Sequence, residues 1–390
     1  MTRFEFATAT KILYGEGVFR EAAPIASQMG RRALVVNGLK GEFIDTLTAD
    51  LKALGMDCFT YEVVAEPTVD SIECGLRYAK EKACDVVLGL GGGSAIDTGK
   101  VIAVLATNPG VVLDYLEVIG NGMEIKVPAL PLIVIPTTAG TGAEVTRNAV
   151  LGSPEHSVKV SLRSALMLPK VALVDPELTY HLPRDITAYT GLDALTQLIE
   201  PFASVSANPM TDALCRDGIR RAAHSLPKVY FDGKDKEARA DMAIASLFGG
   251  LALANAKLGA VHGFAGPIGG MFPIPHGAIC ARLLPIVMDV NIRALRMRQP
   301  TALANQRYNE ISMMVTGNAK AEAADGVRWV EELCAAMNIP ALSNYGVTRE
   351  SIPILVEMAA RSSSMKGNPV HLAATEMQEI LERALLPRTD

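Results

Sequence analysis

The sequence predicts an α/β N-terminal half, in which helices cover both faces of a parallel sheet, and an all-helical C-terminal half. The first half alternates near-continuous apolar runs with amphipathic helical patterns, as parallel sheets do. After residues 171–185 such runs cease, and segments rich in Ala, Leu, Met and charge follow. The 390 residues also exceed the roughly 250–300 at which single cores stop growing. We therefore expect an α/β domain over 1–182 and a helical domain over 183–390.

Each expected element is placed by its apolar pattern and its flanking turn residues. In the first half, a strand is predicted over residues 57–64, strands that end in turns are predicted within 31–38, 85–94 and 131–142, and helices are predicted over 43–55, 69–83 and 95–107. In the second half, helices are predicted over 186–204, 208–230, 238–257 and 305–317. Glycines and prolines in residues 259–278 predict a helix end, a loop and a new helix start.

Charge and cysteine content narrow the classes of partner and compartment. The net charge is −5, from 37 basic and 42 acidic residues without any like-charge block, which disfavours nucleic acid and anionic membranes as partners. The N-terminus lacks a leader pattern, and no uncharged apolar stretch reaches the ~18 residues that span a bilayer, so we expect a cytoplasmic protein. The six cysteines have no CxxC spacing and are expected to be reduced and mostly buried.

A glycine-rich turn follows the strand predicted within 85–94. Gly91, Gly92 and Gly93 would lie at the carboxyl edge of the sheet and at a helix N-terminus, where nucleotide phosphates bind. Ser94 could cap the helix or contact a phosphate. The spacing is neither GxGxxG nor a P-loop, and a tight turn without a ligand is the alternative. Three consecutive glycines at this edge favour binding.

A second turn, over residues 136–146, follows another apolar strand. Its hydroxyl groups, on Thr137, Thr138 and Thr141, suit contacts to a ribose or phosphate. The two turns together support one extended ligand across the sheet edge.

Two of the six histidines, His262 and His276, lie close together in the sequence. Neutral imidazoles with a carboxylate suit Zn²⁺ or Fe²⁺, and Asp193 is the best-placed carboxylate. Asp193 and Gln197 lie one helical turn apart, so both could project to one metal, or both could be ordinary helix polarity. The remaining histidines are expected in the core or on the surface: His156, His181, His224 and His371.

The ordered motifs GGGSAIDTGK, PTTAGTGAEVT, LPKVALVDPEL, GLDALT and VHGFAG…PHG resemble the iron-containing, or group III, alcohol dehydrogenase family. This family belongs to a superfamily with glycerol dehydrogenase and dehydroquinate synthase. The similarity runs from ATKILYGEG to KGNPVHLAATEMQEIL, almost the whole chain. It implies a dinucleotide-binding domain, a helical domain, a cleft between them for nicotinamide, metal and substrate, and a homodimer.

The resemblance also implies site residues. Metal ligation, and catalysis through the metal, falls on Asp193, His262 and His276, with Gln197 as a further candidate. Cofactor contacts are expected at Asn37, Gly91, Gly92, Gly93, Ser94, Asp97, Thr137, Thr138, Thr141, Lys159 and Leu178. Asn37 stands where members that select NAD often carry an aspartate, so NAD is the default and NADP stays open.

Two departures from the family pattern fall in one site. Gln197 stands where the family has a histidine ligand, and Gly266 stands where it has a second histidine of an HxxxH segment. A carboxamide oxygen is a weaker donor than imidazole, yet three ligands remain, the number that a catalytic zinc site keeps. We therefore expect a retained but altered metal site. Gly266 removes a possible proton relay and leaves room for a larger or more polar substrate.

The function expected from these residues is a metal-dependent, NAD(P)-linked dehydrogenase or aldehyde reductase for a small alcohol, diol or hydroxy acid. One alternative is a reductase of an acidic substrate, of the maleylacetate or hydroxy-acid type, with Lys159 and Arg163 as carboxylate partners. Others are a lyase or cyclase of the dehydroquinate synthase kind and a metal-free nucleotide-binding protein.

Overall fold

The computed structural model describes residues 3–117, 119–156 and 158–387. These residues form two compact units. The first, the sheet unit, consists of Ala7–Thr138 and Gly142–Tyr180. The second, the helical unit, contains the chain from His181 onward, with Ala139–Thr141 and the N-terminal residues up to Phe6. The domain boundary expected at residue 182 stays a prediction.

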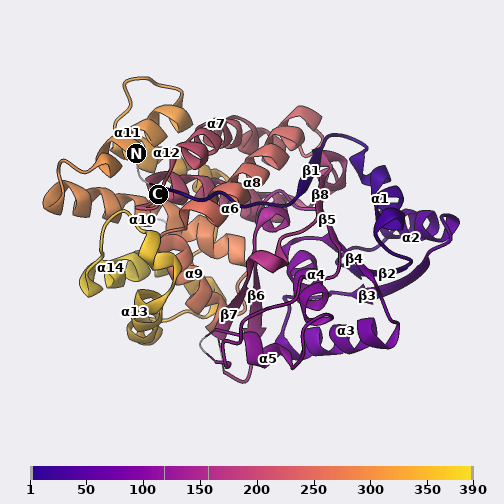
Figure 1. Ribbon diagram of the computed structural model, residues 1–390. Coiled ribbons are helices and arrows are strands. Elements are labelled where there is room, and N and C mark those ends of the chain that lie inside the picture. The colour runs from indigo at the N-terminus through magenta and orange to yellow at the C-terminus, as the bar shows by residue number, and fades with distance from the viewer. Residues whose placement is uncertain (1–2, 118, 157, 388–390) are drawn as a thin grey trace. The chain divides into compact units, whose positions relative to one another are not determined.

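A six-stranded, fully parallel sheet forms the centre of the sheet unit, in the order β1-β8-β5-β4-β2-β3 (Figure 1). Its strands are β1 (Lys11–Tyr14), β2 (Arg32–Asn37), β3 (Asp57–Glu62), β4 (Val86–Gly91), β5 (Leu132–Pro136) and β8 (Val171–Val174). The helices of this unit are α1 (Ala22–Met29), α2 (Glu42–Ala53), α3 (Val69–Glu81), α4 (Gly93–Leu105) and α5 (Val112–Tyr115). The predicted parallel α/β architecture is confirmed.

Strand β4 shows how both faces of the sheet become buried. Leu88 and Leu90 belong to the apolar cluster that includes residues of α1 and α2. Gly89 points to the opposite face, where a Cβ would lie 3.4 Å from the Cα of Ile96 on α4. Because successive side chains of a strand alternate between faces, an almost uninterrupted apolar run is what a strand covered by helices on both sides requires.

The sequence analysis did not predict the antiparallel hairpin of β6 (Asn148–Ser153) and β7 (Val158–Arg163). Its buried residues alternate with polar or partly exposed ones, so it has no long apolar run. The four-residue strands β1 and β8 were also too short to stand out. The strand predicted within 85–94 ends at Gly91, because Gly93 already begins helix α4.

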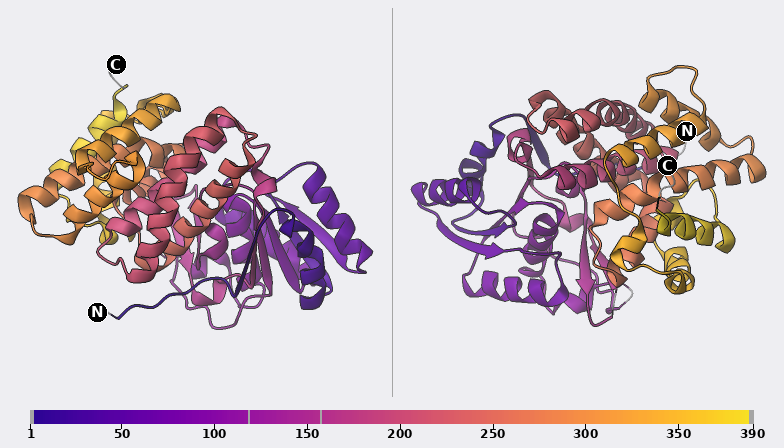
Figure 2. Two further views of the ribbon diagram at one scale, coloured as in Figure 1. Left: turned by 90° about the horizontal axis from the view of Figure 1, so that it is seen from above. Right: turned by 180° about the vertical axis from the view of Figure 1, so that it is seen from behind.

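The helical unit contains only helices and their connections among its described residues (Figure 2). The longer helices are α6 (Arg184–Ala203), α7 (Pro209–Phe231), α8 (Lys236–Ala256), α9 (Ala260–Met271), α10 (His276–Arg298), α11 (Leu303–Thr316), α12 (Ala323–Ala336), α13 (Ile352–Arg361) and α14 (Ala374–Leu385). The four predicted helical segments are confirmed with small shifts at their ends. No single described helix is long and apolar enough to cross a membrane; α8 and α9 would pass only as a pair, which is bent by 98°.

The helix end, loop and new helix start predicted within residues 259–278 are confirmed at Met271, the four residues after it and His276. The stretch holds a complete helix, α9, and the loop is confined to the residues between Met271 and His276. Glycines and Pro267 lower helix propensity, but seven residues of α9 are buried, including Val261, Phe264 and Ile268. Burial of this face outweighs intrinsic propensities of about 1–3 kcal/mol per residue.

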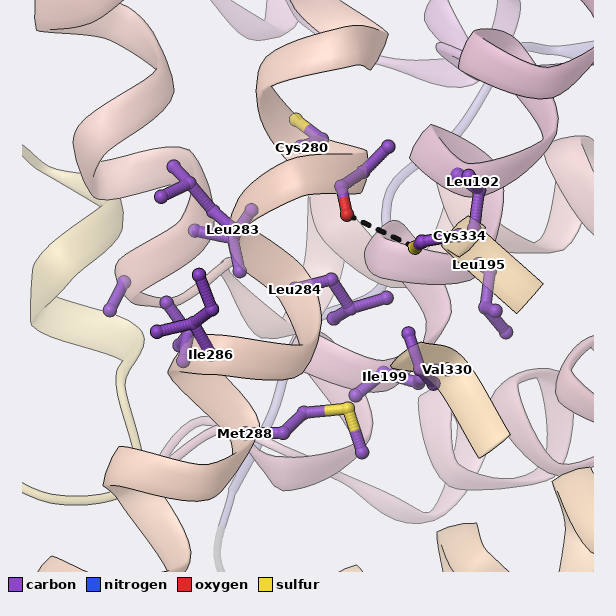
Figure 3. Packing of buried hydrophobic residues seen from close by; sticks show 14 of the residues in the cluster. Leu192, Leu195, Ile199, Cys280, Leu283, Leu284, Ile286, Met288, Val330 and Cys334 are labelled. Carbon is purple, nitrogen blue, oxygen red and sulfur yellow. Dashed lines mark hydrogen bonds between the residues drawn. The ribbon is translucent and has the colours of Figure 1, made fainter. Parts of the chain in front are cut away.

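Helix α6 lies at the centre of the helical core. Its residues from Gly191 to Ala203 are all buried. Leu192, Leu195 and Ile199 belong to the same apolar cluster as Leu284 of α10 and Val330 of α12 (Figure 3). Polar residues on such a helix have no access to bulk water, so each needs a partner inside the protein.

Candidate active site

One face of α6 carries three buried polar side chains. Asp193, Gln197 and Glu200 are 2%, 3% and 6% exposed. They follow one another at intervals of four and three residues, which places them on one side of the helix. The Nε2 group of Gln197 donates a hydrogen bond to Oδ2 of Asp193 at 3.0 Å.

The start of α10 places His276 beside this face. His276 is the first residue of α10, and Gly277 follows it. A Cβ on Gly277 would lie 2.3 Å from the carbonyl oxygen of Tyr189 on α6, so only glycine permits this approach of the two helices. Tyr189 is one turn before Asp193, and the Nε2 atom of His276 lies 3.8 Å from Oδ1 of Asp193.

The start of α9 is fixed by Glu200. Its Oε1 accepts a hydrogen bond from the backbone N–H of Val261 at 2.7 Å, and its Oε2 lies 2.6 Å from Nδ1 of His262. Asn368 caps the same helix end by accepting from the N–H of Ala260 at 3.1 Å. With Nδ1 held by a carboxylate, the imidazole of His262 presents Nε2 toward Asp193, 3.4 Å from Oδ1. A carboxylate behind a histidine is the usual support of a metal ligand.

A fourth donor, Cys280, completes the cluster from α10. Its Sγ lies 3.8 Å from Nε2 of His262 and 3.6 Å from Nε2 of His276. The donor atoms of Asp193, His262, His276 and Cys280 all lie within 4.8 Å of one another. We call these four residues the donor cluster.

The protonation behaviour of the cluster reflects its concentrated charge. Burial alone would raise the pKa of Asp193, but its interactions with His262, His276 and Gln197 hold the pKa below its ordinary value. Burial would lower the pKa of both histidines, yet their interactions with Cys280 and the neighbouring carboxylates raise the pKa of both, and that of His262 most strongly. The cluster therefore stabilises positive charge at its centre.

The donor cluster fits a divalent metal ion. Oδ1 of Asp193 is buried and accepts no hydrogen bond, and Oε1 of Gln197 has no partner either. A buried carboxylate oxygen without a donor is costly, and a cation beside it would remove the cost. Two imidazole nitrogens with oxygen and sulfur form the borderline-soft set that suits zinc and neighbouring transition metals.

The predicted ligands Asp193, His262 and His276 are thus brought together, and Gln197 lies beside them. The sequence analysis missed Glu200 and Cys280. Glu200 could have been found as the next inward position of the α6 face, seven residues after Asp193. Cys280 lies four residues after His276, and only a helix start at His276 makes that spacing meaningful.

In the sheet unit, the glycine turn has the form that phosphate contact requires. Gly91 has φ +150°, and a Cβ there would lie 2.8 Å from Cβ of Ala95 and 3.1 Å from Cα of Gly38. Gly92 precedes α4 as its N-cap without any side-chain cap, so the first N–H groups of the helix have no partner from a capping side chain. Ser94 is not the cap, because it already lies in the first turn of α4.

Two further predicted cofactor segments lie beside this turn. The backbone N–H of Thr137 donates to the carbonyl of Gly91 at 3.0 Å. A Cβ on Gly92 would lie 3.5 Å from Cγ2 of Thr138. Asn37 ends β2, the strand next to β4, and its side chain is bonded in both directions to the backbone of Leu39. The carboxyl ends of β2, β4 and β5 therefore meet at one edge.

The other predicted cofactor residues have structural partners or lie apart from this turn. Asp97 accepts from the N–H of Val150 at 2.9 Å and pairs with Lys100. Lys159 on β7 forms an ion pair with Glu66. Leu178, in a short 3₁₀ turn (Pro176–Thr179) after β8, is buried in the apolar core, and Thr141 is half-buried. Their contacts to a cofactor stay predictions.

The remaining histidines lie on the surface, and only half of the cysteines are buried, fewer than expected. His156, His181, His224 and His371 are all exposed. Of the six cysteines, none forms a disulfide; Cys215, Cys280 and Cys334 are buried, Cys58 and Cys84 half-buried, and Cys74 exposed.

A parallel sheet with a glycine turn at its edge, and a buried set of metal-type donors, are typical of metal-dependent enzymes that use a dinucleotide. The family model of iron-containing alcohol dehydrogenases matches residues 9–176, and the model of the C-terminal region of the same family matches residues 187–385. The chain belongs to the iron-containing alcohol dehydrogenase family and is an oxidoreductase acting on CH–OH groups. The resemblance seen in the sequence motifs is confirmed.

Individual relatives agree over nearly the full length. Alcohol dehydrogenase 4 of Saccharomyces cerevisiae (strain YJM789) is 36% identical over 381 residues, which cover 95% of this chain and 96% of the relative. The crystal structure of a 1,3-propanediol oxidoreductase is similar with a TM-score of 0.91 and 31% identity, over 98% of this chain and 100% of that one. A sulfoacetaldehyde reductase from Bifidobacterium kashiwanohense, in complex with NAD⁺, has a TM-score of 0.84 and 26% identity, over 99% of both chains.

Proposed function

We propose that the protein transfers a hydride between NAD and a small alcohol, diol or hydroxy acid, with a divalent metal held by Asp193, His262 and His276. The observation that carries the proposal is Oδ1 of Asp193, a buried carboxylate oxygen without a hydrogen-bond donor, surrounded by two imidazole nitrogens at 3.4 and 3.8 Å. A metal bound there would act as a Lewis acid toward the substrate's oxygen. NAD binding by this chain is inferred from its glycine turn and from the relative whose structure contains NAD⁺.

The residues around the site supply orientation rather than proton transfer. Glu200 orients His262, and Gln197 holds the second oxygen of Asp193. Gly266, one turn after His262, carries no side chain, and a Cβ there would meet no other atom within 4 Å. Protons must therefore leave through water or cofactor hydroxyls, and the space suits a substrate larger or more polar than a simple alcohol.

The alternative functions have less support. A reductase of acidic substrates would need cations to hold the carboxylate, yet Lys159 is already paired with Glu66 and Arg163 is exposed. A transient-redox lyase or cyclase would produce no net NADH. In a metal-free binding protein, nothing would offset the cost of burying Oδ1 of Asp193 without a hydrogen-bond donor. Cytoplasmic location and a homodimeric state remain part of the proposal, and light scattering of the purified protein tests the dimer.

The decisive assay follows nicotinamide absorbance with a panel of alcohols, diols, hydroxy acids, sugar acids and aldehydes. It uses NAD⁺/NADH and NADP⁺/NADPH, and protein freed of metal and reloaded with Zn²⁺ or Fe²⁺. We expect net cofactor turnover that requires the metal and disappears when His262 and His276 are both replaced by alanine. Full activity of that double variant would overturn the role of the metal.

A further inference from the structure

The donor cluster contains one group that neither the sequence motifs nor the family resemblance assigns. Cys280 is completely buried and lies on α10, one turn after His276. Cys280 belongs to the apolar cluster of the helical unit, but its Sγ also lies within 4 Å of the Nε2 atoms of both histidines. Leu283, Leu284 and Ile286 follow it along the same helix and belong to the same cluster, but none of them has a metal-type donor atom (Figure 3).

Four of the six distances between the donor atoms are close to those of a coordination tetrahedron, and the other two are below 4.8 Å. Zinc bonds of about 2.0–2.1 Å to nitrogen or oxygen and 2.3 Å to sulfur put neighbouring donors roughly 3.3–3.6 Å apart. Here the two nitrogen–oxygen distances are 3.4 and 3.8 Å, and the two nitrogen–sulfur distances are 3.8 and 3.6 Å. These four distances would need to shorten by at most a few tenths of an ångström to match zinc coordination.

Gln197 supplies the second, independent observation. Its Nε2 is committed to Asp193, while its Oε1 is buried without a partner. The residue at this position therefore positions Asp193 and leaves Oδ1 of that carboxylate without a hydrogen-bond donor. A carboxamide oxygen is also a poor replacement for the imidazole that the family resemblance implies at position 197. One strong donor is missing from α6, and one additional donor is present on α10.

We propose that the thiolate of Cys280 is the fourth protein ligand of this metal site and replaces the histidine absent at position 197. The proposal rests on the metal site of the proposed function. On binding, the thiol proton leaves to solvent as the sulfur–metal bond forms. The soft thiolate makes the site select zinc over ferrous iron, and its negative charge with that of Asp193 balances a divalent ion. Zinc can still expand to five ligands.

A second buried thiol provides a matched control. Cys334 on α12 is as deeply buried as Cys280 and lies in the same apolar cluster. Its S–H donates to the carbonyl oxygen of Ala281 at 3.3 Å, a purely structural contact that Figure 3 shows. Replacing either cysteine by serine thus makes the same chemical change in the same core, whereas Cys280 alone of the two belongs to the donor cluster.

The test loads the full-length, metal-free protein with Co²⁺. We expect one bound equivalent with a near-ultraviolet thiolate-to-cobalt charge-transfer band. The band should disappear in Cys280→Ser and in Cys280→Ala and persist in Cys334→Ser. Adding Gln197→His to Cys280→Ser should restore tight binding without the band, because nitrogen then replaces sulfur. Competition between metals should show that Cys280→Ser loses at least tenfold more affinity for zinc than for ferrous iron.

X-ray absorption at the zinc edge needs no variant, so it remains decisive if a substituted protein fails to fold. We expect one sulfur at about 2.3 Å in the unmodified zinc protein. Stoichiometric binding with only nitrogen and oxygen neighbours, or a cobalt band that survives Cys280→Ser, would overturn the thiolate ligand but leave the proposed function intact. A wild-type protein that binds no metal would overturn both.

Discussion

Two carboxylates on buried helices, Asp193 in the helical unit and Asp97 in the sheet unit, were both expected to contact a ligand. Both oxygens of Asp97 have protein partners, Lys100 and the N–H of Val150. Asp193 has a partner for Oδ2 only. Burial raises the pKa of Asp97 even beside Lys100, whereas the neighbours of Asp193 outweigh burial and lower its pKa. A saturated carboxylate holds a fold together, and an unsaturated one is available to a ligand.

The largest expected effect comes from Asp193→Asn. This change keeps the shape but removes the charged donor, so we expect loss of bound metal and a fall in kcat/KM on the order of a thousandfold. The metal-free protein should lose some stability as well, because the neighbours that lower the pKa of Asp193 favour its charged form. Metal analysis and steady-state kinetics measure the first effect, and urea unfolding of the metal-free protein measures the second. If the variant keeps its metal but unfolds at much lower urea concentrations, Asp193 is a structural carboxylate and not a metal ligand.

Asp97→Asn should show the opposite pattern. Lys100 is fully buried, and losing its carboxylate leaves a buried ammonium hydrogen-bonded to Thr146 and the carbonyl of Asn148, with only a weaker electrostatic interaction with Glu144. Breaking a buried ion pair typically costs about 3–5 kcal/mol. We expect the free energy of unfolding to fall by about 3 kcal/mol, the lower end of that range, and the metal content to stay unchanged. If stability were unchanged and NAD affinity fell, Asp97 would instead be the cofactor residue that the resemblance implies.

The same buried charge group predicts a pH effect through Glu144, which is 2% exposed. Burial raises the pKa of its carboxyl from 4.5 to about 7, although Lys100 opposes the shift. The fold therefore favours the protonated form, and the stability associated with it is full below pH 4.5 and lost as the pH rises through 7. We expect Glu144→Gln to be more stable than the wild type at pH 8 by about 3 kcal/mol.

Urea unfolding of both proteins between pH 4.5 and pH 8 checks this expectation. At the acidic end the two should have similar free energies of unfolding, which serves as the internal control. Parallel pH profiles would mean that Glu144 finds compensating partners when charged, and that the sheet unit tolerates an unneutralised carboxylate.

Short sequence patterns were enough to predict the longer strands and the glycine turn of the sheet unit. The apolar runs placed β2, β3, β4 and β5, and the glycine turn followed from its position after a strand. The β6–β7 hairpin was not predicted, because buried and more exposed side chains alternate along its strands. Its pairing also joins residues up to 15 positions apart, Asn148 with Arg163. A hairpin register depends on such pairing rather than on one strand alone.

In the donor cluster, too, the residues that depend on contacts between distant segments were not predicted. Asp193, His262 and His276 were predictable because their residue types are typical ligands and the motifs are ordered. Cys280 was classed with the buried thiols, since only the packing of α10 against α6 at Gly277 brings its sulfur to the histidines. Glu200 was likewise hidden, because its role depends on where α9 begins.

The smallest expected effect tests whether Glu200, a second buried carboxylate on α6, is structural, as Asp97 is, or serves the metal. Glu200→Gln keeps an oxygen to accept from Val261 but removes the charge beside Nδ1 of His262. Loss of such a supporting carboxylate typically lowers metal affinity by about tenfold to a hundredfold. We expect that loss in chelator competition, with near-normal unfolding. Unchanged affinity with a large loss of stability would show that Glu200 acts mainly as the cap of α9, and would group it with Asp97 rather than with Asp193.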